Sequence, residues 1–342
     1  MSISRFASRV GVLSLALLTV ACSPNRMIGT QLNHFATDHV IPSAMTLDDI
    51  SLVCHANEST VPLFMGYEHY KVNSDLVLAF SYSGSAICTE QEAVEKELWS
   101  TLAAKQKWYD VAQDARISQQ LLNRDAGLRQ LKAYQYATNY FKNNYRYDIG
   151  EGECPKFKKQ IEEYLLLVSA TSALQALQND ISSGRLVGVD MSIPPKIGRA
   201  MACLNNEKWW GEPQAIAAGL KTILPKDANE ERAAWKGLQD ATDVGLQTGV
   251  RLSHAIYATM ASAKGREDYL RDALKRFEAV PVASLDPKYK LLNQISALQI
   301  RHVANRYWMA NEGHRAPTEN FSIFWDEKAQ PSKEMNKLLD DM

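Results

Sequence analysis

The chain has 342 residues, with 38 Lys and Arg against 39 Asp and Glu, which gives a formal net charge of −1 at pH 7. It contains no block of basic residues, so its charge pattern argues against nucleic acid as a partner. Its length allows a large hydrophobic core, in one elongated domain or in two smaller ones.

Residues 1–21 have the layout of a secretory signal peptide, and Cys22 follows them directly. Arg5 and Arg9 precede the apolar run of residues 10–21, VGVLSLALLTVA. This run is shorter than the stretch of about 20 apolar residues that a bilayer-spanning helix needs. The small residue before Cys22 matches the processing site of bacterial lipoproteins, so the pattern predicts a lipidated cysteine. The alternatives are a plain signal peptide and a short buried helix.

A lipidated Cys22 predicts a location in the cell envelope, facing the periplasm. One acyl chain binds a bilayer only marginally, whereas a multiply acylated cysteine gives a stable anchor. Residues 22–27 would then form a short tether between the lipid and the folded chain. Ser23 takes the place of the Asp that retains many Gram-negative lipoproteins in the inner membrane. This favours the outer membrane and leaves the inner membrane open.

Four further cysteines remain once Cys22 is assigned to lipid. They are Cys54, Cys88, Cys154 and Cys203, an even number in a chain expected to reach an oxidising compartment. Of the three possible pairings, Cys54 with Cys88 and Cys154 with Cys203 is favoured, because each bond joins neighbouring segments. Each would stabilise the fold by about 2–4 kcal/mol. Four buried free thiols are the alternative.

Helical periodicity extends through most of the remaining chain, and almost no run alternates like a strand. Thr89 and Glu92 have the spacing of a capping box, which predicts that a long helix begins at Thr89 and carries Trp108 on its apolar face. Pro155 is expected as the first residue of another helix. The apolar spacing predicts helices over residues 27–41, from 46 onward, and over 89–111, 117–141, 156–182, 196–204, 214–224, 230–263, 267–279 and 287–310.

These elements predict an all-α fold of antiparallel helix hairpins, as a tetratricopeptide-like bundle or solenoid. Residues 183–195 are rich in Gly and Pro and form the clearest break, either as a linker or as an ordered loop at a site. Residues 28–183 are expected to form an N-terminal helical region. Residues 184–342 would form a C-terminal helical region that is continuous with the first, with the aromatic residues of its tail packed back on the body.

One segment has the spacing of a tetratricopeptide helix. Residues 266–280, REDYLRDALKRFEAV, place Ala273 and Phe277 like the small and aromatic positions of a second repeat helix, and Pro281 follows. With the lipoprotein signal, Asp48-Asp49 at a helix start and the long irregular helix pairs, the chain resembles the T-component lipoproteins of TRAP transport systems. The resemblance implies a helical-repeat periplasmic lipoprotein with an internal pore or cleft, associated with uptake of small hydrophobic or carboxylate-bearing ligands.

The sequence lacks the motifs of well-marked catalytic, nucleotide and metal sites: GxSxG, the Walker loop, GxGxxG, HExxH and paired CxxC. We therefore expect no enzyme activity, no cofactor and no metal. His34 and His39 are five residues apart and fall on different helix faces. Cys54 beside His55 would suit a thiol nucleophile, but the disulfide is favoured. A cell-wall enzyme would have to use one of the glutamates at positions 151, 153, 162 and 163.

Arg185, Trp209 and Trp210 are the candidate ligand-binding residues. Two adjacent indoles in a turn offer a large apolar area, and Arg185 could pair with a carboxylate. The alternative is that both indoles seal a helix junction. The expected function is non-catalytic uptake or relay of a small hydrophobic molecule, such as a fatty acid or hydrocarbon, with an envelope transport protein as a possible partner. A protein-interaction scaffold is the second hypothesis, and a cell-wall enzyme the third.

Overall fold

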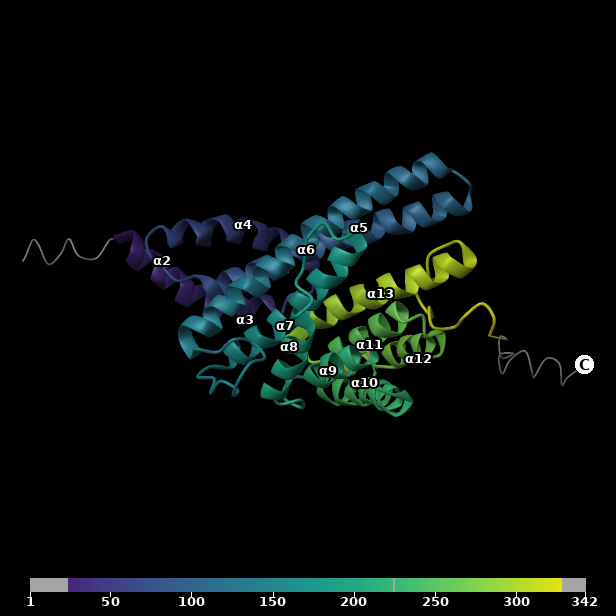
Figure 1. The fold of residues 1–342 in the computed structure, drawn as a ribbon. Helices are drawn as coiled ribbons and strands as arrows, with labels where there is room; N and C mark the ends of the chain where they lie inside the picture. The colour runs from purple at the N-terminus through teal and green to yellow at the C-terminus, as the bar shows by residue number, and fades with distance from the viewer. Residues whose placement is uncertain (1–23, 224, 328–342) are drawn as a thin grey trace, which may run out of the picture.

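The described part of the chain consists of helices and their connections. The computed structural model describes residues 24–223 and 225–327, and no strand occurs among them. The predicted all-α fold is therefore confirmed. The N-terminal group lies at one end of the molecule in Figure 1 and consists of α2 (Pro24–Phe35), the π-helical η1 (Ala36–Val40), α3 (Ile41–Ala44) and α4 (Ile50–Glu68).

The predicted signal peptide and Cys22 lie outside the described residues. Residues 24–27, which were expected in a short tether, instead form the first turn of α2. Within the two described segments, no helix combines the length and the apolar character needed to cross a bilayer.

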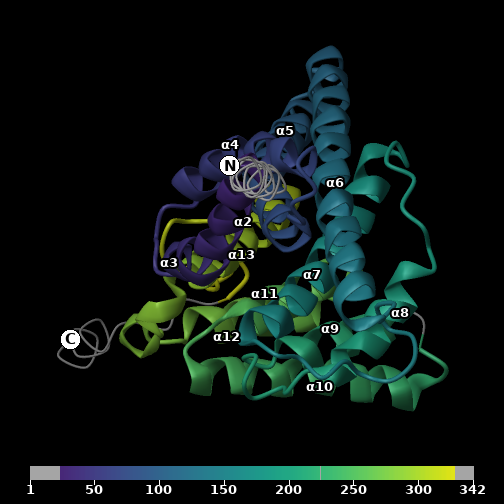
Figure 2. The same cartoon turned by 90° about the vertical axis from the view of Figure 1, so that its left-hand side faces the viewer.

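The longest hairpin of the described residues is made by α5 (Asp75–Lys105) and α6 (Tyr109–Tyr145). These helices have 31 and 37 residues, so at 1.5 Å per residue they are about 46 and 55 Å long. α7 (Gln160–Ser183) packs along α6. The turn between α5 and α6 projects from the rest of the molecule in Figures 1 and 2. The buried face of α6 is rich in small side chains that let α5 approach closely: Ala112, Ala115, Ala126, Ala133 and Ala137.

Two predicted helix starts in this region are wrong. α5 runs through Thr89 without a break, because the Thr89 hydroxyl does not cap a helix and instead accepts a hydrogen bond from Arg129 Nη1 at 3.0 Å. Gly84 lies within the same helix and packs closely on α4: a Cβ at this position would lie 2.4 Å from Asn57 Nδ2. Pro155 does not begin α7, which starts at Gln160.

The second half of the described chain contains shorter helices. Trp210 and Gly211, both with positive φ, form the turn that leads into α9. The elements are α8 (Ile193–Ala200), η2 (Met201–Cys203), α9 (Glu212–Ile223), α10 (Ala228–Thr248), α11 (Leu252–Ala263), α12 (Glu267–Glu278), η3 (Val282–Ser284), η4 (Pro287–Tyr289) and α13 (Lys290–Glu312).

The single helix predicted over residues 230–263 is two helices. Gly249 has φ +73° and ends α10, and a Cβ at this position would lie 2.7 Å from both Asp286 N and Ser284 O. The amide of Asp286 donates to Gly249 O at 3.1 Å, so the connection before α13 holds this turn in place. The break therefore arises from a long-range contact that needs glycine at this position.

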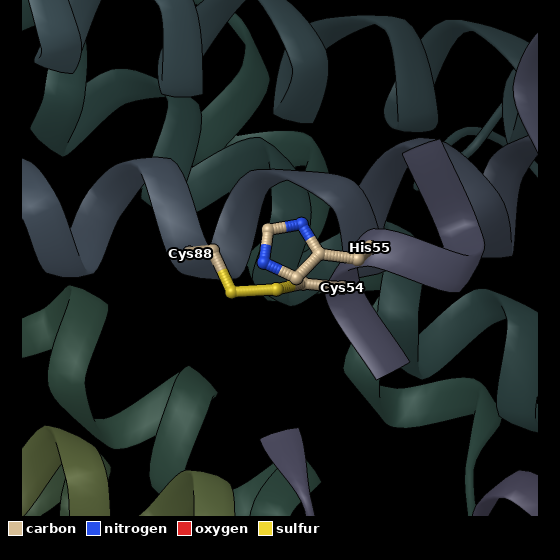
Figure 3. A group of neighbouring side chains, drawn as sticks. All are labelled: Cys54, His55 and Cys88. Atoms are coloured by element: carbon tan, nitrogen blue, oxygen red, sulfur yellow. A yellow bond between two sulfur atoms is a disulfide. The ribbon is translucent and has the colours of Figure 1, made fainter. Parts of the chain in front are cut away.

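Both predicted disulfides are present. Cys54 of α4 is bonded to Cys88 of α5, with Cα atoms 6.1 Å apart (Figure 3). Cys154, in the connection between α6 and α7, is bonded to Cys203 of η2, with Cα atoms 5.3 Å apart. Each bond joins segments that are neighbours along the chain, as the sequence predicted.

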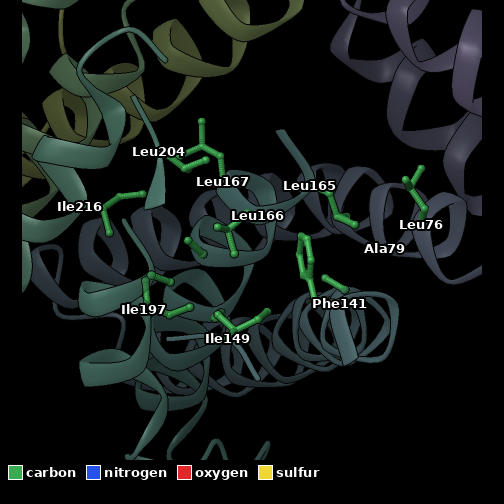
Figure 4. Close-up of a cluster of buried hydrophobic side chains, with 14 of the residues drawn as sticks. Leu76, Ala79, Phe141, Ile149, Leu165, Leu166, Leu167, Ile197, Leu204 and Ile216 are labelled. Carbon is green, nitrogen blue, oxygen red and sulfur yellow. The ribbon is translucent and has the colours of Figure 1, made fainter. Parts of the chain in front are cut away.

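The main hydrophobic core is continuous across the Gly- and Pro-rich break at residues 183–195. It connects Leu76 of α5 and Phe141 of α6 with Leu166 of α7, and it extends to Ile197 of α8 and Ile216 of α9 (Figure 4). A second cluster fills the space between α10, α11, α12, α13 and the following tail, and its members include Trp235, Tyr257, Leu274, Trp308 and Phe324. The tail thus packs back on the body, and the two halves share one core.

Candidate functional site

The two tryptophans expected to bind a ligand are buried in the core. Trp209 is 2% exposed and Trp210 is 4% exposed. Trp209 stacks on Tyr164 of α7 with ring centroids 5.7 Å apart, and its Nε1 donates to Glu163 Oε2 at 2.9 Å. Trp210 meets Tyr289 of η4 edge-on at 4.6 Å. The two indoles therefore seal a junction between elements and offer no open surface to a ligand.

Arg185 stabilises the loop after α7. Its Nη1 lies 3.3 Å from Oδ2 of the fully buried Asp180, which also accepts hydrogen bonds from the amides of Val187, Gly188 and Val189 at 2.9–3.1 Å. Burial alone would raise the pKa of Asp180, but these hydrogen bonds outweigh burial and lower it. The carboxylate therefore fixes the loop.

The structure does not bring Arg185 to the tryptophans. Trp209 contacts the first turns of α7, whereas Arg185 follows the last turn of the same helix. From Tyr164 to Ser183, α7 rises by about 28 Å at 1.5 Å per residue. The three residues therefore do not form one binding site.

Two surface hollows lie beside the Cys154–Cys203 disulfide, with volumes of about 590 and 470 Å³. They share Tyr147, Glu151, Gly152 and Cys154 in their walls. The charged side chains of their lining come from the connection between α6 and α7 and from α8: Arg146, Glu151, Glu153, Lys156, Lys158 and Arg199. A fatty acid needs a mostly apolar cavity, whereas the larger hollow has five charged residues in its lining.

Glu162, one of the glutamates considered for catalysis, is engaged in structural contacts. Glu162 is buried and accepts hydrogen bonds from the hydroxyls of Tyr140 and Tyr145 at 2.7 and 2.5 Å. It also accepts from the amides of Lys158 and Lys159 at 2.8 Å each. Burial alone would raise the pKa of Glu162, but these four donors outweigh it and lower the pKa. Glu162 thereby ties the loop before α7 to α6.

The neighbouring glutamates are also paired. Glu163 accepts from Lys208 Nζ at 2.8 Å as well as from the Trp209 indole. Glu151 forms an ion pair with Lys196 at 2.7 Å. These pairings give both carboxylates a structural role.

The turn between α5 and α6 presents exposed aromatic side chains to solvent. Trp108 is 53% exposed and Tyr109 is 68% exposed. Trp99 in the last turns of α5 and Val111 in the first turn of α6 are exposed as well. We call these four residues the arm tip. Trp108 was expected on the apolar face of one helix together with Val94 and Leu98, which are indeed buried. The chain reverses at residues 106–108, so Trp108 instead precedes the first residue of α6 and is exposed to solvent.

The arm formed by α5 and α6 is braced by α13. Val94 and Leu98 of α5 pack on Met309 of α13. Glu97 of α5 forms an ion pair with Arg306 of α13, and the Lys105 ammonium donates to Ala310 O at 2.7 Å. These contacts reach the last turn of α5, so the arm tip is held by the body.

An apolar stripe follows the solvent face of α6. Ile117, Leu121 and Leu128 are 49%, 44% and 44% exposed, and their spacing of four and seven residues places them on one side of the helix. The sequence predicted a helix over residues 117–141, and the structure places these three apolar side chains on its exposed side. The stripe extends the exposed apolar surface of the arm beyond its tip.

No protein-family model, no curated protein and no solved structure matches this chain.

Proposed function

We propose that the chain is a lipid-anchored scaffold of the bacterial envelope, in which the arm of α5 and α6 binds a partner protein through its tip. The observation that supports this most is the arm tip: Trp99, Trp108 and Tyr109 are exposed at the end of a braced helix hairpin. Exposed apolar groups that lie together on a surface are candidates for a binding site. Trp and Tyr are also the side chains most enriched among the residues that dominate protein interfaces.

The anchor and the arm tip would act at opposite ends of the molecule. The described chain begins at Pro24, two positions after Cys22, and α2 lies far from the turn of the arm in Figure 1. A bilayer that holds Cys22 would therefore lie at the α2 end. The arm tip would then face a partner away from that bilayer.

The arm tip favours a protein partner with an apolar pocket and polar surroundings. Lys107 and Asp110 lie next to Trp108 and Tyr109 in sequence, and both are exposed. An apolar centre with charged residues at its rim is the usual arrangement of a protein interface. Relay of a fatty acid or hydrocarbon, the other function expected from the sequence, has less support, because Trp209 and Trp210 are buried and the larger hollow is lined by five charged residues.

Site-specific photo-crosslinking in living bacterial cells tests the scaffold. A photoreactive phenylalanine replaces Trp108 in the full chain, and the matched control carries it at Val282, which is 79% exposed and lies on η3. We expect a discrete protein adduct from position 108 and none from position 282. The absence of a reproducible adduct from position 108, or the same adducts from both positions, would contradict the proposal.

The anchor has its own test. We expect the mature protein to begin at Cys22 and to carry acyl chains detectable by intact mass spectrometry. Cys22→Ser should abolish acylation and release the chain from membranes. An unmodified Cys22 in the membrane-purified protein would contradict the lipid anchor. The role of the arm tip would still be tested by crosslinking.

A further inference from the structure

Cys54, His55 and Cys88 form a compact group between α4 and α5. One potential ligand atom of each residue lies within 4.8 Å of the others, two sulfurs and an imidazole nitrogen. Figure 3 shows the His55 ring beside the disulfide. His55 is exposed, whereas Cys54 is fully buried. The group thus has a closed side formed by the helix pair and an open side at the imidazole.

A hydrogen-bond network holds His55 in this position. His55 Nδ1 lies 3.2 Å from Glu58 Oε2, and Arg129 Nη1 donates to Glu58 Oε1 at 2.7 Å. Arg129 is fixed in turn by Ser85 O at 2.5 Å. A carboxylate on one nitrogen orients an imidazole and leaves the other nitrogen for a metal, as second-shell carboxylates do at zinc sites.

We propose that reduction of the Cys54–Cys88 disulfide creates a zinc site made of these two thiolates and the His55 imidazole. Two Cys and one His are a known zinc ligand set when water takes the fourth position. The open side of the group at His55 leaves room for that water. The disulfide and the metal site use the same two sulfurs, so each state excludes the other.

A dithiol reductant can convert the Cys54–Cys88 disulfide into the two thiols that the zinc site needs. The dithiol transfers two electrons and two protons to the disulfide, the Cys54–Cys88 bond breaks, and the dithiol becomes a disulfide itself. Each new thiol then loses its proton to solvent as it binds Zn²⁺, so binding releases two protons. The site does not depend on the function of the arm tip.

The second disulfide is an internal control. Cys154 and Cys203 are also paired, but the side chain near Cys203 Sγ is the Tyr147 hydroxyl, at 3.7 Å. Among the described residues, the only group of three or more metal-ligating side chains at this spacing is that of Cys54, His55 and Cys88. Reduction of the Cys154–Cys203 bond should therefore create no comparable zinc site.

Zinc titration of the purified full chain tests the proposal, with a phosphine as the in vitro reductant and a chromophoric zinc chelator as competitor. The reduced chain should bind one Zn²⁺, and the oxidised chain should bind at least tenfold more weakly. His55→Ala should weaken binding at least tenfold, whereas His69→Ala, at another exposed histidine, should leave it unchanged. Cys54→Ser with Cys88→Ser should abolish binding, and Cys154→Ser with Cys203→Ser should preserve it.

Cobalt gives a second readout. The reduced chain with Co²⁺ should show thiolate-to-metal absorption that disappears in the Cys54→Ser, Cys88→Ser variant. Equal zinc affinity of the oxidised and reduced chains, or of His55→Ala and the unaltered chain, would overturn the proposal. Loss of helical circular dichroism on reduction would overturn it too, because the site needs the folded pair of α4 and α5.

Discussion

Arg306 of α13 forms a bidentate ion pair with Glu97 of α5. Arg306 Nε lies 3.0 Å from both carboxylate oxygens, and Nη2 lies 2.8 Å from Oε2. Both side chains are 31% exposed, so solvent screens the pair in part. The pair joins segments far apart in sequence and braces the arm on the body.

Arg306→Ala should lower the free energy of unfolding by about 0.5–1 kcal/mol at low ionic strength. Arg306→Lys keeps the charge without the paired hydrogen bonds, so its free energy of unfolding should lie between those of Arg306→Ala and the unaltered chain. The difference in free energy of unfolding between the unaltered chain and Arg306→Ala should shrink in about 1 M salt, where the Debye length is about 3 Å. Urea unfolding at both ionic strengths measures it, and an equal effect in both salts would contradict an electrostatic brace.

Glu162→Gln should destabilise the chain at neutral pH. The pKa of Glu162 is lowered in the fold, so its carboxylate stabilises the fold above its ordinary pKa of 4.5, and this contribution is lost as pH falls through the folded value. We expect a loss of about 1–3 kcal/mol at pH 7, because four donors lose a charged acceptor. Urea unfolding of both proteins should show a smaller gap at about pH 3. A gap independent of pH would count against this role.

Glu212 should have the opposite pH dependence. It is 3% exposed, and burial raises its pKa from 4.5 to about 8. Because the carboxyl pKa is raised in the fold, its contribution to stability is fully present at a pH below the unfolded chain's pKa of 4.5. This contribution is lost as the pH rises towards the folded pKa of about 8. Glu212→Gln should therefore be close to the unaltered chain in stability near pH 5 and more stable by at least about 1 kcal/mol near pH 8. A variant less stable at both pH values would refute this.

Gly150 and Gly152 provide a matched pair in one loop. Their φ angles are +77° and +76°, but a Cβ on Gly150 would lie 1.9 Å from Lys196 O, whereas one on Gly152 would meet nothing within 4 Å. Gly152→Ala should cost about 1–2 kcal/mol through backbone strain alone. Gly150→Ala should cost about 1–3 kcal/mol more, because the loop must move away from α8. Thermal unfolding of both variants measures the difference, and equal losses would contradict the close packing.

Local chemistry in the sequence predicted part of the fold. The spacing of the cysteines predicted both disulfides. Acidic residues at the start and basic residues at the end of α12 mark its limits, and the structure places that helix within one residue of the predicted segment 267–279. These features depend on neighbours in the chain, so they can be inferred without the tertiary structure.

The errors come from contacts between distant residues. Thr89 has a capping sequence, but Arg129 uses its hydroxyl within a continuous helix. Gly249 ends a helix because the segment at Ser284 packs against it. Trp209 is buried because Tyr164 supplies its stacking partner. Apolar content alone cannot distinguish such a buried indole from the exposed Trp108, so the arm tip could not be predicted from the sequence.

Replacing the exposed aromatic side chains shows whether the arm tip binds a partner. A photoreactive phenylalanine at Val111 is combined with Trp99→Ser, Trp108→Ser and Tyr109→Ser in the full chain. Since all three side chains are exposed, these changes should leave helical circular dichroism and thermal unfolding nearly unchanged. We predict that the adduct from position 111 falls at least tenfold when the aromatic residues are replaced. An adduct of undiminished yield in the folded variant would contradict the claim.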